Sequence, residues 1–127
     1  MTAEKTSDNV QEVMQSAIGR TRSYFESEFN ISVTEVDTGV GNLDSLTLLD
    51  MTAIIGMGGL VNLLIAFSFQ DGLINALYQR MTEGMEVQPD EVEMYREAAA
   101  GEVVNTILRS CTIDLQKLDR QGISMTP

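Results

Sequence analysis

Residues 51–69 constrain the fold of this 127-residue chain more than any other stretch, because these nineteen consecutive residues carry no charge. A stretch of about 20 apolar residues is long enough to span a bilayer. The glycine-rich segment 56–59 would weaken a helix at its centre, and the flanking residues are Asp50 and Asp71 rather than Lys or Arg. We therefore predict a β-hairpin, and membrane association through residues 51–69 is the less favoured alternative.

The predicted hairpin has strands at residues 46–55 and 60–68, with its turn in the glycine-rich segment. Both arms are rich in β-branched and aromatic side chains, which favour strands. The arms are also almost continuously apolar. We therefore expect both faces of these strands to be covered, either by helices or by a second subunit.

Helical periodicity marks most of the remaining chain. Apolar residues recur at intervals of three and four in three segments, residues 8–30, 73–82 and 90–118. Residues 31–36 instead alternate between apolar and polar side chains, which predicts another strand. Gly84 occupies the place of a left-handed residue after the second helix.

These elements predict a single α+β domain over residues 1–127, with long helices packed on a mainly antiparallel sheet in two layers. Residues 123–127 begin another extended piece and then the sequence stops. Three explanations are open: C-terminal strands are lacking, the short tail suffices, or a partner subunit supplies the edge. Because unpaired sheet edges invite association, we expect a homodimer.

The composition excludes several kinds of function. A net charge of −11 argues against nucleic-acid binding, which needs Lys and Arg, and suits a partner with a basic surface. The chain has no histidine, the commonest general base and zinc ligand, and we predict no metal site. The single cysteine, Cys111, cannot form an intrachain disulfide. With no signal-peptide pattern at the N-terminus, we expect a cytoplasmic protein.

The third predicted helix has two distinct faces. Its apolar stripe, expected to face the core, consists of Ala100, Val103, Val104, Ile107, Leu108, Cys111, Leu115 and Leu118. The opposite stripe runs through Ala98, Glu102, Asn105 and Arg109. Gly101 beside it is costly in a helix and therefore asks for a packing or docking reason. From spacing alone, Glu102 and Asn105 could bind a partner cation and a water, or could simply form a solvated face.

The order of these elements and three local patterns resemble the CheC/CheX/FliY family of chemotaxis phosphatases, and the CheX type most closely. The first two patterns are the hairpin, residues 53–59 and 63–69, and the helix that follows it. The third is Gly-Glu-Val-Val-Asn at residues 101–105, which is similar to the family's E-x-x-N signature in its long helix. The resemblance covers residues 46–127.

The resemblance implies a CheC-like fold and an enzyme that removes the aspartyl phosphate of a response regulator such as CheY. Glu102 and Asn105 would be the catalytic pair: Glu102 would anchor on a lysine of the regulator, and Asn105 would orient the attacking water. Ala98, Gly101 and Arg109 would contact the regulator. The chain would need no cofactor of its own, since Mg²⁺ would belong to the regulator.

The sequence departs from the family pattern at one site position. Where the family usually has Asp or Ser, four residues before the glutamate, this chain has Ala98. A second hypothesis is therefore a non-catalytic acidic docking domain, which would bind a response regulator or a flagellar switch component through the same helix face.

Overall fold

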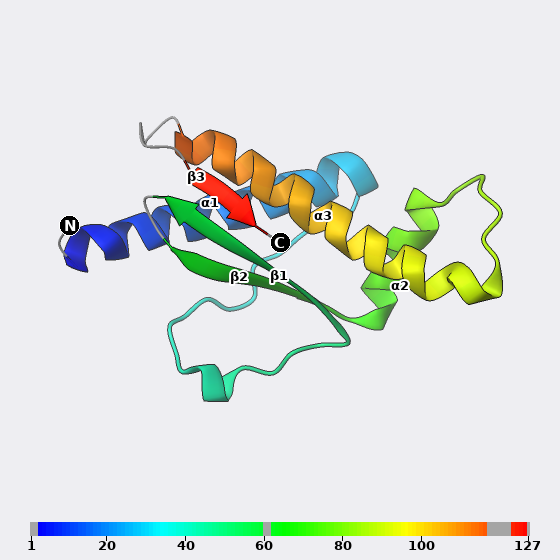
Figure 1. Ribbon diagram of the computed structural model, residues 1–127, viewed down its shortest axis with the longest axis horizontal. Helices are drawn as coiled ribbons and strands as arrows, with labels where there is room; N and C mark the ends of the chain where they lie inside the picture. The colour runs from blue at the N-terminus through cyan, green and yellow to red at the C-terminus, as the bar shows by residue number, and fades with distance from the viewer. Residues whose placement is uncertain (1–2, 60–61, 117–122, 127) are drawn as a thin grey trace.

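The computed structural model describes residues 3–59, 62–116 and 123–126 as a mixed α+β arrangement (Figure 1). In chain order its elements are helix α1 (Ala3–Phe29), the 3-10 helix η1 (Leu43–Ser45), strands β1 (Met51–Gly59) and β2 (Leu63–Phe69), helix α2 (Asp71–Met81), the 3-10 helix η2 (Pro89–Glu91), helix α3 (Val92–Gln116) and strand β3 (Ile123–Thr126).

The strands form one antiparallel sheet in the order β2-β1-β3. The predicted hairpin is confirmed, but its first strand begins at Met51 rather than at residue 46, and the predicted turn at residues 56–59 is wrong, because β1 continues through Gly59. The reason lies in the alternation of side chains: Met57 points to the core and is only 3% exposed, so a turn at Gly56 would remove it from the core. β3 pairs with this glycine-rich half of β1, from Gly56 opposite Thr126 to Gly59 opposite Ile123.

One face of the sheet is covered by helices α1 and α3, which pack against each other and cross in the view of Figure 1. Ile55 and Phe69 of the sheet join one core cluster with Phe25 of α1 and Leu108 of α3. Among the described residues no element covers the other face, contrary to the expectation that both faces would be covered. Its Leu64 is 77% exposed.

Helix α3 has the predicted apolar stripe. The seven predicted core positions that the structure describes are all buried: Ala100, Val103, Val104, Ile107, Leu108, Cys111 and Leu115. The eighth, Leu118, lies outside the described residues. Burial raises the pKa of the Cys111 thiol, so this residue is a small core side chain, as its place on the stripe predicted.

Residues 31–36 are not a strand. Ile31 and Val33 alternate with exposed neighbours and pack on the core, but none of the described strands pairs with this segment. A cleft of about 460 Å³, lined by Val33 and by Ile65 and Phe67 of β2 among others, separates the segment from the edge of the sheet. The alternation of apolar residues therefore reflects which side chains face the core. It does not indicate hydrogen bonding to a neighbouring strand.

The helix boundaries agree with the prediction to within a few residues. Helix α1 starts earlier, at Ala3, and is followed by Asn30, which adopts a left-handed backbone with φ 54°. Gly84 has φ 80°, as predicted for a residue that follows a helix. Within the ranges that the structure describes, no helix is both long enough and apolar enough to cross a membrane.

Replacing Leu108 by Ala tests the core assignment. Leu108 is 0% exposed, so Leu108→Ala leaves a cavity and should lower the free energy of unfolding by about 2–5 kcal/mol. Urea denaturation followed by circular dichroism measures this change. Ile113→Ala is the matched control on the same helix, since Ile113 is 57% exposed and should change stability by less than about 0.5 kcal/mol. Equal losses in the two variants would show that the helix faces are wrongly assigned.

Candidate functional site

The outward face of α3 carries the predicted site residues on a firmly anchored helix. Its opposite side is buried against α1 and the sheet. Ala98, Glu102 and Arg109 are exposed, as predicted, whereas Asn105 is half-buried rather than exposed. The structure therefore brings the catalytic candidates and the docking candidates together along one stripe of a single helix.

Glu102 makes one hydrogen bond, within its own helix. The Thr106 hydroxyl donates to Glu102 Oε1 over 3.3 Å. Within the described residues the carboxylate has no basic partner, so its charge is available to a docking molecule.

Tyr24 of α1 lies beside this carboxylate. Burial raises the pKa of the Tyr24 phenol, and the negative charges of Glu102 and Glu28 raise it further, while a hydrogen bond with Thr106 lowers it. The Tyr24 ring is held edge-on against Phe25 and Phe29, with centroids 6.0 and 5.6 Å away. An aromatic residue of fixed orientation thus borders the Glu102 side of the site.

Asn105 lies between two opposite charges. Glu102 is one helical turn before it and Arg109 one turn after it, so the carboxylate and the guanidinium leave the helix roughly 10 Å apart along its axis. Among the described residues, neither the Asn105 amide nor the Arg109 guanidinium has a hydrogen-bond or ion-pair partner. The amide can therefore offer both a donor and an acceptor to a molecule docked on this face.

Gly101 has no packing role inside the described part of the chain. A methyl group added at its Cα would meet no atom within 4 Å, apart from its chain neighbours and the backbone of its own helix. Packing within the described residues therefore does not explain this helical glycine. The other explanation, close approach of a docking partner, stays a prediction.

An acidic cleft opens on the other side of Gly101, between the start of β1 and the first turns of α3. Its volume is about 380 Å³, and its lining includes the carboxylates of Asp50, Glu93 and Glu97 and the hydroxyl-bearing Thr52. These residues lie outside the E-x-x-N segment. Sequence reasoning missed the cleft, because it depends on how β1 and α3 are placed in space.

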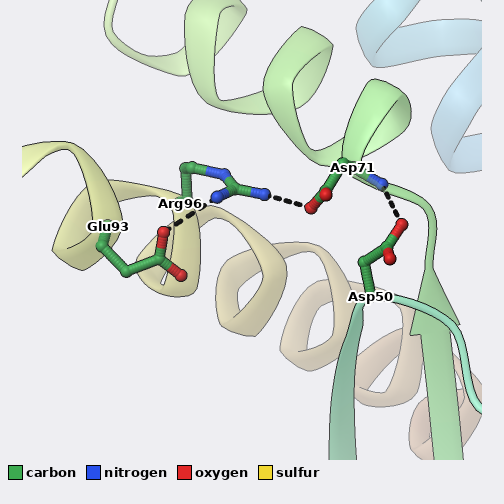
Figure 2. A network of polar contacts seen from close by, with 4 residues as sticks. All are labelled: Asp50, Asp71, Glu93 and Arg96. Carbon is green, nitrogen blue, oxygen red and sulfur yellow. Dashed lines mark hydrogen bonds and ion pairs between the residues drawn. The ribbon is translucent and has the colours of Figure 1, made fainter.

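A polar network holds this end of α3 in place (Figure 2). Arg96 donates to Asp71 Oδ1 over 2.6 Å and to Glu93 Oε2 over 2.8 Å, and Asp50 Oδ2 accepts from the Asp71 backbone N–H over 2.9 Å. The hydrogen bond with Asp71 raises the pKa of Arg96. The network ties α3 to the start of α2 and to the residue before β1.

Arg96 itself is the second feature that sequence reasoning missed. Its side chain is only 17% exposed, and its Nε is buried without a hydrogen-bond partner among the described residues. In the sequence Asp71 is only a flank of the uncharged stretch, and no spacing rule connects it with Arg96, which lies 25 positions away on another helix.

A metal site was not predicted, and among the described residues no group of three or more His, Cys, Asp or Glu side chains is placed to hold a metal ion. Comparisons with family models, with curated protein sequences and with solved structures found no match to this chain.

Replacing Gly101 by Ala tests whether this glycine has a structural role in helix α3. The added methyl group enters open space, so Gly101→Ala should stabilise the fold by up to about 1 kcal/mol through helix propensity. Gly19→Ala is the matched control, because Gly19 of α1 is equally unobstructed and lies away from the site. Urea denaturation of both variants measures the change. A loss of stability in Gly101→Ala alone would mean that this glycine has a structural role.

The titration of Tyr24 tests the geometry around Glu102. Absorbance at alkaline pH, in a background with Tyr78→Phe and Tyr95→Phe, should give a Tyr24 pKa above the ordinary value of about 10. Glu102→Gln should lower that pKa, though not to the ordinary value, because burial persists. Glu97→Gln should leave it unchanged.

The same shift has a consequence for stability. The folded state holds the Tyr24 proton more tightly than the unfolded chain does, so this contribution is complete below about pH 10 and is lost as the pH rises through the folded pKa. An identical Tyr24 pKa in the wild type and in Glu102→Gln would contradict the proximity of the two side chains.

Proposed function

We propose that this chain is a phosphatase of the CheX type, with a CheC-like fold, acting in the cytoplasm on the aspartyl phosphate of a CheY-like response regulator. The observation that supports the proposal is the pairing of Glu102 and Asn105 on the outward face of α3. Both groups project from a helix whose other side is buried, and neither is engaged by an opposite charge within the described residues.

The proposed reaction is hydrolysis. Water attacks the phosphorus of the regulator's aspartyl phosphate, the bond from phosphorus to the aspartate oxygen breaks, and the products are inorganic phosphate and the free carboxylate. Such reactions are accelerated mainly by positioning and charge stabilisation. The Asn105 amide would hold the water in line with the leaving oxygen, because it can accept from the water and donate to a phosphoryl oxygen.

The proposed docking uses the rest of the stripe. Glu102 would pair with a lysine of the regulator, and its hydrogen bond with Thr106 restricts the carboxylate beforehand. Ala98 and Gly101 leave the helix surface low enough for a partner backbone to approach. Arg109 would contact acidic or phosphoryl groups on the far side of Asn105.

The magnesium ion in this proposal belongs to the regulator, where it would neutralise phosphoryl charge. In this proposal the chain itself contributes the Asn105 amide, the Glu102 carboxylate and the surface on which the regulator docks.

A second candidate function is docking without catalysis. The acidic cleft beside Gly101 supports it, because three carboxylates adjoin the same helix face and would favour a basic partner surface. Ala98, which replaces the usual Asp or Ser, supports it as well. Such a domain would bind a response regulator or a flagellar switch component and leave its phosphoryl group intact.

Phosphate release from a phosphorylated response regulator with magnesium distinguishes these functions. The wild type should accelerate release, and Asn105→Ala should reduce that acceleration by about 100-fold, because the water is no longer held in line. Glu102→Lys should instead weaken binding to the regulator. Gln116→Ala is the control on the same helix, at an exposed position beyond the proposed site.

Each possible outcome of this experiment supports or contradicts one of the two candidate functions. Acceleration that persists in Asn105→Ala would contradict the phosphatase proposal. Binding without acceleration by the wild type would establish the docking domain. Unchanged affinity in Glu102→Lys would remove Glu102 from the contact.

A further inference from the structure

Strand β2 presents an unprotected edge to the segment that follows α1. It is an outer strand of the described sheet, which has the order β2-β1-β3. In an antiparallel edge strand, every second residue directs its backbone N–H and C=O groups away from the sheet. β2 contains neither a charged residue nor a proline, which are common means of keeping such an edge from pairing. Its edge can therefore accept another extended segment.

Residues 31–36, which we call the strap, have an equally unused backbone. The Ile31 N–H donates to the Phe25 carbonyl oxygen near the end of α1 over 3.0 Å. After it, the backbone groups of residues 32–36 form no hydrogen bond with any part of the chain that the structure describes. Water can satisfy these groups while they are exposed. The same groups are available to pair with the edge of a strand.

Two clefts show that the strap runs antiparallel to β2. One, of about 360 Å³, is lined among others by residues 31–33 and 67–69, which are the start of the strap and the end of β2. The other, of about 460 Å³, is lined among others by residues 35–39 and 65–67. Later residues on one side thus face earlier residues on the other. The strap therefore lies along β2 in the opposite direction.

The alternation of side chains indicates the register of this alignment. Val33 and Phe67 line both clefts, so they mark facing positions on the two segments. Both side chains pack on the same core cluster. With Val33 opposite Phe67, Ile31 lies opposite Phe69, and all four side chains belong to one apolar layer. A shift by one residue would turn the apolar side chains of the strap to solvent.

The polar residue on the inward side of the strap also has a counterpart. Glu35 lines the larger cleft, where it accepts a hydrogen bond from the Thr38 hydroxyl. Arg22 of α1 lines the same cleft and forms no ion pair with the residues that the structure describes. In the register above, Glu35 faces α1. The strap can therefore close without leaving a buried carboxylate unpaired.

We propose that the strap closes onto the free edge of β2 as a fourth antiparallel strand, with Val33 opposite Phe67. Closing replaces the two clefts with hydrogen bonds between strands and buries Ile31 and Val33 more deeply. It also covers the edge of β2, so the strap controls whether that edge is open to an extended segment of another protein. No residue of the proposed phosphatase site takes part, and the test is therefore independent of that function.

Disulfide trapping in the full chain tests the register. Thr34 and Ala66 are both exposed, and they lie opposite each other when the strap is closed. A disulfide needs its two Cα atoms within about 7 Å of each other. Under mild oxidation, Thr34→Cys with Ala66→Cys should therefore crosslink about 10-fold faster than Thr34→Cys with Leu64→Cys, which is two residues out of register.

The variant with Leu64→Cys is the matched control, because Leu64 lies on the same strand and on the same exposed face as Ala66. Peptide mapping distinguishes the new disulfide from one that involves the native cysteine. An equal or higher rate of crosslinking in the control would overturn the proposal. The absence of a crosslink in both variants would overturn it as well.

Amide hydrogen exchange of the wild type provides a measurement without engineered cysteines. Pairing with β2 should slow the exchange of every second amide within residues 32–36 by about 10-fold or more relative to an unstructured peptide. Val33→Asp should remove this protection, because it places a carboxylate against the core. Val40→Asp is the matched control, since Val40 is fully exposed in the same connection and the change in charge is identical.

Far-ultraviolet circular dichroism checks that both aspartate variants are folded, and the wild-type exchange rates do not depend on either. Exchange of all the amides of residues 32–36 at the unprotected rate in the wild type would overturn the proposal. Protection that persists in Val33→Asp would overturn the assignment of Val33 to the inward side.

Discussion

The burial of one side of α3 is the constraint on which the rest of the structure depends. Val103, Val104, Ile107 and Leu108 are at most 1% exposed, and the helices α1 and α2 and the hairpin all pack around this stripe. Once these side chains leave water, the opposite stripe of α3 must face outward, since both belong to one rigid helix. The orientation of Glu102 and Arg109 thus follows from packing, and the candidate site needs no loop to present it.

Local patterns predicted the parts of the fold that local chemistry controls. The two stripes of α3, the hairpin and the left-handed Gly84 all follow from periodicity or backbone preference within a few neighbouring residues. The prediction failed where two explanations share one pattern. Glycines are compatible with a turn and also with a strand that lacks large side chains on its outer face. The strand forms here because Met57, between these glycines, is buried in the core. Residues 31–36 alternate between apolar and polar side chains as a strand does. Their apolar side chains pack on the core without strand pairing.

The remaining features of the site region depend on distant residues. Asn105 is on the expected stripe but half-buried, because its surroundings are set by neighbouring elements as well as by its own helix. The Arg96 network joins α2, α3 and the start of β1, and the acidic cleft exists only after these elements are placed. No spacing rule connects such residues. The side chains that a helix face presents were therefore predictable, whereas the cleft beside them was not.

Cys111 gives the chain a built-in probe of its own opening. The Cys111 side chain on the buried face of α3 is 0% exposed to solvent, and burial favours the protonated, unreactive form of its thiol. A thiol reagent can modify it only in molecules in which the surrounding core has transiently separated. Because this is the only cysteine in the chain, the labelling rate of the unaltered protein measures the opening of its central helix directly.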